Sequence, residues 1–209
     1  MPTRQLDHWT GAFGAEYLDR NNDTSEADLA PRARALASML SGCPAAPGSI
    51  LEVGANIGRN LMALQRHTDA QLYAVEPFEQ AYSKLNELIG PKLAGSVCAS
   101  GQSLPHADSS IDLVFTSGVL IHVGPADLPS VMSEVVRVAR RYVWCNEYFS
   151  KQPEEISYRG ESGLLFKRDF GRLYMEMFPD LKPLAQGFFW SATTPFDDTT
   201  WWLFEKPAV

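Results

Sequence analysis

Residues 50–60 read Ile50-Leu51-Glu52-Val53-Gly54-Ala55-Asn56-Ile57-Gly58-Arg59-Asn60, an apolar run that leads into a glycine-containing turn and the start of a helix. Gly54 permits a tight turn, and Gly58 permits the close approach of a backbone or a helix. The free N–H groups at the start of such a helix favour a carboxylate or a phosphate. This stretch therefore predicts a strand–turn–helix unit that carries a ligand site.

A second acid follows at the end of the next predicted strand, where Glu76 and Pro77 stop the apolar run 71–75. A carboxylate at this position can accept two hydrogen bonds from a ribose diol. The glycine turn and Glu76 together predict an adenosine-type cofactor. The simpler alternative is a plain strand–turn–helix connection with a solvated Glu76.

The details of the turn discriminate between cofactors. A dinucleotide fold requires Gly-x-Gly-x-x-Gly so that the pyrophosphate lies against the helix terminus. Asn56 occupies the middle position here, and no third glycine follows at the required offset. Glu52 is a poor neighbour for pyrophosphate but attracts a cationic amino-acid group. A sulfonium nucleoside that carries an amino acid is therefore favoured over NAD.

The rest of the chain alternates between strand and helix patterns. Strands are predicted at 49–53, 71–75, 95–98, 111–116 and 142–145, with helices at 60–65, near 78–89 and at 127–138. Two late strands, near 184–190 and 200–205, have no helix between them and are therefore predicted to be antiparallel. This order predicts an α/β fold with a mostly parallel seven-stranded sheet, an antiparallel last strand and helices on both faces.

Two regions flank this core. Trp9, Phe13 and Tyr17 recur every four residues and predict one face of an N-terminal helix, despite Gly11 and Gly14. This face either packs on the core or forms a lid that excludes water from a ligand. A second helix is predicted at about 26–40, and the polar segment 146–169, without predicted regular structure, precedes a last helix that ends near residue 178.

The composition excludes several classes of protein. Of the 209 residues, 18 are Lys or Arg and 25 are Asp or Glu, so a duplex nucleic-acid partner is not expected at a net charge of −7. No apolar run approaches the roughly 20 residues that a membrane helix requires, and the N-terminus lacks a signal-like apolar region. The cysteines Cys43, Cys98 and Cys145 form no Cys-x-x-Cys pair, which argues against a disulfide framework and a zinc site and predicts a reducing, cytoplasmic location.

Several motifs together support a family resemblance over residues 48–148. They are Glu52-x-Gly54-x-x-x-Gly58, Glu76, Gln102-Ser103-Leu104-Pro105-x-x-Asp108-Ser109-Ser110-Ile111-Asp112-Leu113-Val114-Phe115, and Gly118-Val119-Leu120-Ile121-His122-Val123. In order and spacing this set resembles class I S-adenosylmethionine-dependent methyltransferases. The resemblance implies a Rossmann-like fold, S-adenosylmethionine as cofactor and S-adenosylhomocysteine as product.

A narrower resemblance covers nearly the whole chain. Its segments are Trp9-x-Gly11-x-Phe13-Gly14-x-x-Tyr17-x-x-Arg20-Asn21, Gly54-Ala55-Asn56-Ile57-Gly58, Glu147-Tyr148, Tyr158-Arg159-Gly160, Leu165-Phe166-Lys167-Arg168-Asp169-Phe170 and Asp197-Asp198-Thr199-Thr200-Trp201. They are similar to the pseudaminic acid biosynthesis-associated methylase family, and Asn56 agrees with this family's turn. The family is named mainly for its gene neighbourhood, so its name does not specify an acceptor.

The resemblance implies roles for individual residues. It places Glu52, Gly54, Ala55, Asn56 and Gly58 around the methionine part of the cofactor, and Glu76 with Pro77 at the ribose. It places Ser100 and Gly101 at the adenine, although many relatives have Asp at the position of Ser100. Ser117 and Gly118 are expected at the mouth of the pocket, with Trp9 and Tyr17 covering it.

Other residues are candidates for chemistry or for acceptor binding. His122 is the first candidate for a general base, because a histidine with a near-neutral pKa is the usual proton acceptor; the alternative is packing and helix capping. Glu147 and Tyr148 end the fifth strand, at the sheet edge where ligands bind. The cations Arg159, Lys167 and Arg168 predict recognition of an anionic acceptor group, against a solvated loop or a local pair with Asp169.

We therefore predict one methyltransferase domain, with an N-terminal helical lid (1–45), a cofactor core (48–148), an acceptor-side insertion and helix (149–180) and C-terminal antiparallel strands (181–209). The predicted acceptor is a small or medium polar molecule, with an anionic group as one option: a sugar, a nucleotide-sugar or a secondary-metabolite intermediate. The alternatives are a nicotinamide-dependent sugar oxidoreductase and a non-catalytic nucleoside-binding partner. No metal is expected, no membrane partner is expected, and a homodimer is left open.

Overall fold

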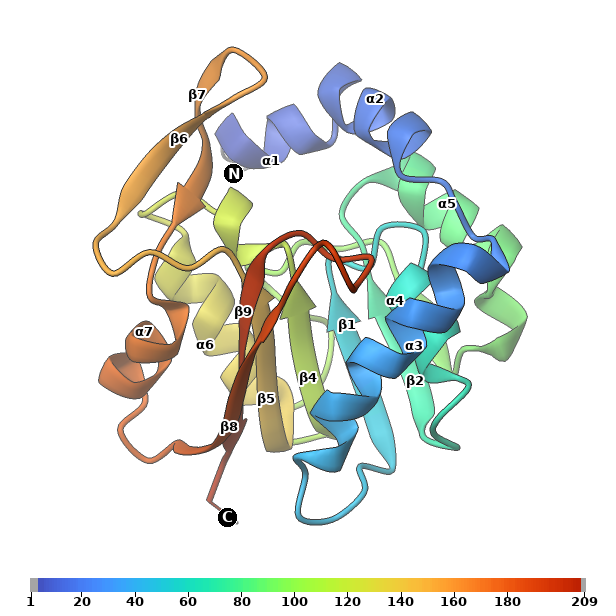
Figure 1. Ribbon diagram of the computed structural model, residues 1–209, viewed down its shortest axis with the longest axis vertical. Helices are drawn as coiled ribbons and strands as arrows, with labels where there is room; N and C mark the ends of the chain where they lie inside the picture. The colour runs from blue at the N-terminus through green and yellow to red at the C-terminus, as the bar shows by residue number, and fades with distance from the viewer. Residues whose placement is uncertain (1–3, 208–209) are drawn as a thin grey trace.

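The computed structural model describes residues 4–207 and contains a seven-stranded sheet with the order β3-β2-β1-β4-β5-β9-β8 (Figure 1). Its strands are β1 (Ser49–Val53), β2 (Gln71–Val75), β3 (Gly95–Val97), β4 (Ile111–Ser117), β5 (Ala139–Glu147), β8 (Lys182–Phe189) and β9 (Thr199–Glu205). Strands β1 to β5 pair in parallel, whereas β9 is antiparallel to both of its neighbours. The predicted fold class, with its antiparallel last strand, is confirmed.

Helices cover both faces of this sheet. On one face α3 (Glu26–Ser41), α4 (Arg59–Leu64) and α5 (Glu79–Leu88) pack against Tyr142 and Trp144 of β5 and their neighbours. On the other face α6 (Leu128–Val138) and α7 (Phe170–Met177) pack against Val143 and Cys145. Because successive strand residues point to opposite faces, the continuous apolar run of each central strand supplies two separate cores. Two short 3₁₀ turns, η1 (Gly90–Lys92) and η2 (Leu120–His122), complete the connections.

The N-terminal segment forms two helices, so the prediction of a single helix was wrong. The chain breaks between α1 (Arg4–Trp9) and α2 (Ala12–Arg20), where Gly11 is extended with φ −103° and ψ −154°. Glycine in a helix interior costs about 1 kcal/mol relative to alanine, which favours a break at this position. The aromatic side chains still meet, since the Trp9 ring lies 5.1 Å from the rings of both Phe13 and Tyr17.

A β-hairpin occupies the segment in which no regular structure was predicted. Strand β6 (Glu154–Tyr158) pairs with β7 (Glu161–Lys167) through the two-residue loop Arg159-Gly160. Both loop residues have positive φ, 54° and 86°, as a type I′ turn requires. The hairpin and the helices α1 and α2 lie across the end of the sheet at which the parallel strands finish (Figure 1).

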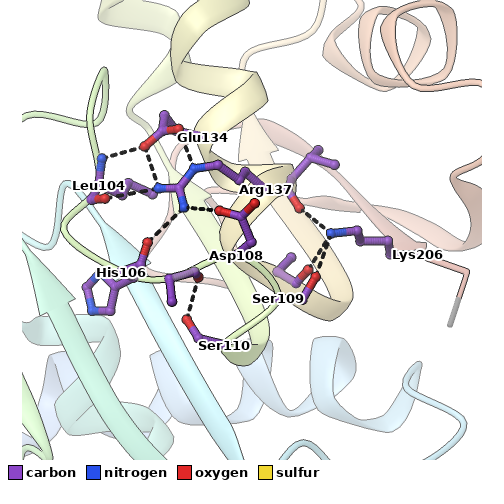
Figure 2. Close-up of polar contacts among 11 residues, drawn as sticks. Leu104, His106, Asp108, Ser109, Ser110, Glu134, Arg137 and Lys206 are labelled. Atoms are coloured by element: carbon purple, nitrogen blue, oxygen red, sulfur yellow. Dashed lines mark hydrogen bonds and ion pairs between the residues drawn. The ribbon is translucent and has the colours of Figure 1, made fainter. Parts of the chain in front are cut away.

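A polar network fixes the connection between β3 and β4 to α6 (Figure 2). The Arg137 guanidinium donates to the carbonyl oxygens of Leu104 (3.0 Å) and His106 (2.8 Å) and to the carboxylates of Asp108 and Glu134, both at 2.6 Å. Glu134 in turn accepts from the Leu104 amide at 2.6 Å. One side chain on α6 thus satisfies several backbone groups of a connection that would otherwise depend on water.

We predict that Arg137→Met lowers the free energy of unfolding by about 1–3 kcal/mol, because it removes charge-assisted bonds to two carbonyls and two carboxylates. Urea unfolding of the ligand-free protein measures this change. The matched control is Arg66→Met, which removes only an exposed pair with Glu26 and should cost less than about 1 kcal/mol. Equal stability of the two variants would contradict the role assigned to Arg137.

Candidate functional site

A cavity of about 560 Å³ opens at the carboxyl ends of the parallel strands. Its floor is formed by the turns that follow β1, β2, β3 and β4, and residues of α1, α2, η2 and the β6–β7 hairpin cover it. Open parallel sheets bind ligands at this edge, where the loops after adjacent strands diverge. Most of the ligand residues predicted from the sequence line this cavity.

The glycine turn after β1 comes close to the loop after β4. Gly54 has φ 75°, and a Cβ atom there would lie 2.6 Å from Cγ2 of Val119, so no larger residue fits without a shift. Asn56 is also left-handed, with φ 49°, a conformation that asparagine tolerates better than most residues. Its backbone N–H donates to Glu76 at 2.7 Å. This explains why the turn closes without the middle glycine of a dinucleotide site.

The remaining residues of the turn divide between the cavity and the protein core. Ala55 and Asn56 line the cavity, as predicted. Gly58 does not: with φ 81° it is the residue before α4, and a Cβ there would lie 3.0 Å from Ile89, the residue after α5. Its structural role is to allow close packing of α4 and α5.

Glu52 is buried beneath the turn with one oxygen satisfied. Asn60 donates from its side-chain amide to Oε1 at 2.7 Å, whereas Oε2 has no hydrogen-bond partner within residues 4–207. Burial raises the pKa of Glu52 to about 8. A buried carboxyl that lacks one hydrogen-bond partner, on a residue that lines a cavity, is suited to a cationic group of a ligand.

Glu76 is held by backbone groups at the end of β2. It accepts from the amides of Asn56 (2.7 Å) and Phe78 (2.9 Å), and burial raises its pKa to about 7. Each carboxylate oxygen can accept more than one hydrogen bond, so capacity for a diol remains. Pro77, the next residue, also lines the cavity.

The turns after β3 and β4 bring four more predicted residues to the cavity: Ser100, Gly101, Ser117 and Gly118. Asn146 of β5, which sequence reasoning did not select, lies beside them and donates to the Ser117 hydroxyl at 3.1 Å. Its Oδ1 atom has no partner among the described residues.

His122 lies on η2 among aromatic rings. Its ring is 4.3 Å from that of Trp9 and 5.6 Å from that of Tyr158, and its Nδ1 lies 2.8 Å from the Leu164 carbonyl oxygen. A carbonyl oxygen can only accept, so Nδ1 carries the proton and Nε2 keeps its lone pair. Burial lowers the pKa of His122 to about 4, and the ring is therefore neutral at physiological pH.

Glu147 does not line the cavity, so the structure does not place it among the residues that could touch a reacting atom. It is fully buried and accepts from the backbone amides of Val119 and Ile121, each at 3.3 Å. Burial raises its pKa to about 7. Glu147 thus anchors the loop that carries His122.

Tyrosines form the other side of the covered space. Tyr148 lines the cavity and donates its hydroxyl to Asp197, and burial raises its pKa above the usual range. Tyr17 and Trp9 also line the cavity from the N-terminal helices, as predicted, and burial raises the pKa of Tyr17. The indole Nε1–H of Trp9 has no acceptor within residues 4–207.

The three predicted acceptor cations are not brought together. Arg159 lines the cavity from the tip of the hairpin. Lys167 lies 5.5 Å above the Tyr148 ring outside the cavity lining, and Arg168 is buried, with its guanidinium 4.6 Å above the Phe166 ring and 3.4 Å from the Val123 carbonyl. Successive residues of an extended chain point in opposite directions, so Lys167 at the end of β7 and Arg168 directly after it face different surroundings.

Many residues that sequence reasoning did not select also line the cavity, among them the polar side chains Arg32, Arg59, Asn60, Asn146 and Asp197. Arg59 and Asn60 follow the glycine turn directly, which is a signal that could have been used. Arg32 arrives from α3, far from the recognised motifs, and no local pattern marks it. Within residues 4–207 no group of His, Cys, Asp and Glu side chains could hold a metal ion, and no helix there is long and apolar enough to cross a membrane.

Comparisons with known proteins agree with this arrangement. Residues 51–145 match the family described as "Methyltransferase domain". The 1,6-didemethyltoxoflavin-N1-methyltransferase of Burkholderia thailandensis, solved with S-adenosylhomocysteine, is similar at 17% identity and a TM-score of 0.74, over 99% of this chain and 90% of that chain. The magnesium protoporphyrin IX methyltransferase of Synechocystis PCC 6803 is similar at 13% identity and a TM-score of 0.67, over 97% and 95%. No curated protein sequence matches significantly.

The fold alone does not specify a reaction, since the [4+2]-cyclase SpnF also shares it, at 14% identity and a TM-score of 0.65 over 85% of this chain and 81% of that chain. The family match over residues 51–145 adds the missing information. It bears out the predicted enzyme class, a methyltransferase, over those residues. The two similar methyltransferases were solved with S-adenosylhomocysteine and with S-adenosylmethionine, the product and cofactor that the sequence predicts for this chain.

The buried carboxyls predict how stability depends on pH. The pKa values of Glu52, Glu76 and Glu147 in the folded protein, about 8, 7 and 7, exceed their ordinary value of 4.5. The folded state therefore holds more protons between these limits, and the stability that protonation provides is lost as the pH rises through 7 to 8. The melting temperature of the ligand-free protein should fall between about pH 5.5 and 8.5, by roughly 2–4 °C for each kcal/mol lost. Glu52→Gln should reduce this dependence, and a stability that rises over this interval would contradict the assignment.

Proposed function

We propose that this protein transfers the methyl group of S-adenosylmethionine to a small-molecule acceptor bound between the cavity floor and its aromatic cover. The observation that carries the proposal is the cavity itself, which joins the unpartnered Oε2 atom of buried Glu52 to a covered space lined by Trp9, His122 and Tyr158. The first part suits a cationic nucleoside, and the second excludes water from a reacting centre.

The carboxyl groups of the cavity floor offer hydrogen-bond acceptors that match donors of the cofactor. Oε2 of Glu52 can accept from the ammonium of the methionine part, next to Gly54 and Ala55. Glu76 can accept from the ribose hydroxyls through oxygens that already orient on backbone amides. Pro77, Ser100 and Gly101 would flank the nucleoside, and Ser117, Gly118 and Asn146 would close the pocket mouth.

Methyl transfer requires little chemistry from the protein. The cofactor supplies an activated methyl group on a sulfonium, so the protein's task is to align the acceptor and exclude water. Trp9 and Tyr17 would cover the reacting centre from above. Tyr148, fixed by its bond to Asp197, would form a wall of the acceptor space, and Glu147 would act as a positioning residue through the loop that bears His122.

His122 is the proposed partner of the acceptor's hydroxyl or amine. With Nδ1 donating to Leu164, the Nε2 lone pair is available to accept a hydrogen bond in the cavity. A pKa of about 4 makes the ring a weak base. It is therefore better suited to orienting the acceptor's X–H group during transfer than to holding its proton afterwards.

The proposed class of acceptor is supported by the segments that cover the cavity, which carry several motifs of the narrower family resemblance. A sugar, nucleotide-sugar or secondary-metabolite intermediate is proposed, and the narrower resemblance to pseudaminic acid biosynthesis-associated methylases supports a biosynthetic acceptor. Only Arg159 of the predicted cations lines the cavity, so it is the proposed contact for an anionic group. The free thiols of Cys43, Cys98 and Cys145 support the proposed cytoplasmic location.

We predict that Glu76→Ala weakens the binding of S-adenosylhomocysteine by about 1.5–3 kcal/mol, because it removes acceptors from two ribose hydroxyls. Isothermal titration calorimetry measures this change, with NAD as the comparison ligand. The wild-type protein should bind S-adenosylhomocysteine and not NAD. Tight binding of NAD alone would overturn the assignment of the cofactor pocket.

We further predict that Arg159→Lys raises the KM for an anionic acceptor without changing cofactor affinity, because lysine keeps the charge but loses the bidentate geometry. Arg168→Lys is the matched control, since Arg168 is buried away from the cavity and should alter thermal stability instead. Acceptors can be screened by release of S-adenosylhomocysteine. Normal acceptor kinetics in Arg159→Lys would remove the anionic-acceptor hypothesis.

A further inference from the structure

Two guanidinium groups share one buried carboxylate at the back of the cavity. Asp28 on α3 accepts from Nε and Nη2 of Arg32, both at 3.1 Å, and also from Nε of Arg59 at 3.2 Å and from its Nη2. Burial acts to raise the pKa of Asp28, but the hydrogen bonds and charges of both arginines together hold it below its ordinary value. The three side chains together carry one positive charge in excess.

This cluster is connected to Glu52 through a single residue. Nη1 of Arg32 donates to the Asn60 side-chain oxygen at 2.9 Å, and the Asn60 side-chain nitrogen donates to Glu52 at 2.7 Å. Arg32, Arg59, Asn60 and Glu52 all line the same cavity. A free carboxyl oxygen and an excess positive charge therefore lie within one short chain of contacts.

The two arginines differ in how many of their donors are used. Arg32 places all three of its nitrogens on protein acceptors, since Nη2 also approaches the Pro195 carbonyl at 3.4 Å, and its guanidinium lies 4.7 Å from the centre of the Phe196 ring. Arg59 uses Nε and Nη2 only on Asp28, and Nη1 has no acceptor among residues 4–207. The side chain of Arg59 remains 20% exposed, against 7% for Arg32.

Asp28 is the only carboxylate within residues 4–207 that forms an ion pair with Arg32 or Arg59. Asp23 is exposed, and its Oδ1 accepts from the backbone amide of Ser25 at 2.8 Å. Glu52 takes its hydrogen bond from Asn60 and makes none with either arginine. Among the described residues, Arg59 thus has no hydrogen-bonded carboxylate besides Asp28. A planar guanidinium held on one side is well arranged to receive a carboxylate on the other.

We infer that Arg59 binds the carboxylate of an α-amino-acid group whose ammonium is bound by Glu52. The inference rests on the proposed function, in which that group is the methionine part of S-adenosylmethionine or S-adenosylhomocysteine. Arg59 is then a ligand-binding residue, whereas Asp28 and Arg32 are positioning residues that set the direction of its guanidinium. The pair Glu52 and Arg59 selects a zwitterion, and nucleosides without an amino acid lose both contacts.

The competing explanation is purely structural, because Arg59 also ties α4 to Asp28 on α3. The two explanations differ in their dependence on the ligand. A loosened α3–α4 contact weakens every nucleoside that fills the cavity. A lost carboxylate contact weakens only ligands that carry the carboxylate.

The test compares S-adenosylhomocysteine with its decarboxylated form, a 5′-aminopropylthioadenosine that keeps the ammonium and lacks the carboxylate. Calorimetry on Arg59→Met should show a loss of about tenfold or more for S-adenosylhomocysteine, the scale of one charge-assisted contact, with the decarboxylated ligand unchanged. Arg59→Lys should fall between wild type and Arg59→Met for S-adenosylhomocysteine alone. Equal losses for both ligands, or no loss for either, would overturn the inference.

Two control variants, the wild-type affinities and a folding check separate the role of Arg59 from the proposed function on which it rests. Arg66→Met removes an exposed arginine that does not line the cavity, and it should leave both affinities unchanged. Glu52→Gln should weaken both ligands, because both carry the ammonium. If the wild-type protein binds neither ligand, the proposed function fails, whereas wild-type binding with no discrimination between them contradicts the role of Arg59 alone. Thermal unfolding of each ligand-free variant verifies its folding, and Arg59→Lys keeps the charge beside Asp28 should Arg59→Met not fold.

Discussion

Burial of a carboxyl group that lacks a full set of partners is costly, and this constraint organises the candidate site. Glu76 and Glu147 meet it with backbone amides, which are fixed in place by the turns that contain them. Glu52 is buried equally deeply but receives only the Asn60 amide. The molecule therefore holds a buried acid with one unpartnered oxygen at the floor of its cavity, and burial raises the pKa of this acid to about 8.

Backbone geometry around this acid follows from the glycine turn. The left-handed conformations of Gly54 and Asn56 direct the chain from β1 over Glu52 and aim the Asn56 amide at Glu76. Close approach of Gly54 to Val119 sets the loop after β4, and Glu147 holds the same loop from below. The ends of β1, β4 and β5 thus contact one another at the cavity, and these contacts position the loop that carries His122.

Local patterns were sufficient for most of this floor. The strands 49–53 and 71–75 follow directly from apolar runs bounded by turn residues, and the spacing of Glu52, Gly54 and Glu76 marks the ligand edge. The β6–β7 hairpin was not predicted because β6 is mostly polar and the turn is an Arg-Gly pair. The break at Gly11 was missed because the aromatic spacing continues across it.

Long-range contacts account for what local patterns could not supply. Asp28 and Arg59 are 31 residues apart, and no periodicity connects them before α3 and α4 pack together. Glu147 was selected for its position at a strand end, but the direction of its side chain depends on the loop after β4. In the same way Arg168 follows Lys167 in sequence yet turns inward against Phe166.

The cover of the cavity comes from segments that lie outside the matched family region. Residues 51–145 supply the floor, whereas α1, α2 and the β6–β7 hairpin meet above it through the rings of Phe13 and Tyr158, 5.6 Å apart, and a bond from Gln5 to the Gly163 carbonyl. The cover is not part of the seven-stranded sheet. Segments outside such a sheet tolerate changes in sequence better than the sheet itself does. Substitutions in the cover can therefore leave the floor unaltered. An architecture of this kind can change the molecule that it methylates while it keeps the same cofactor site.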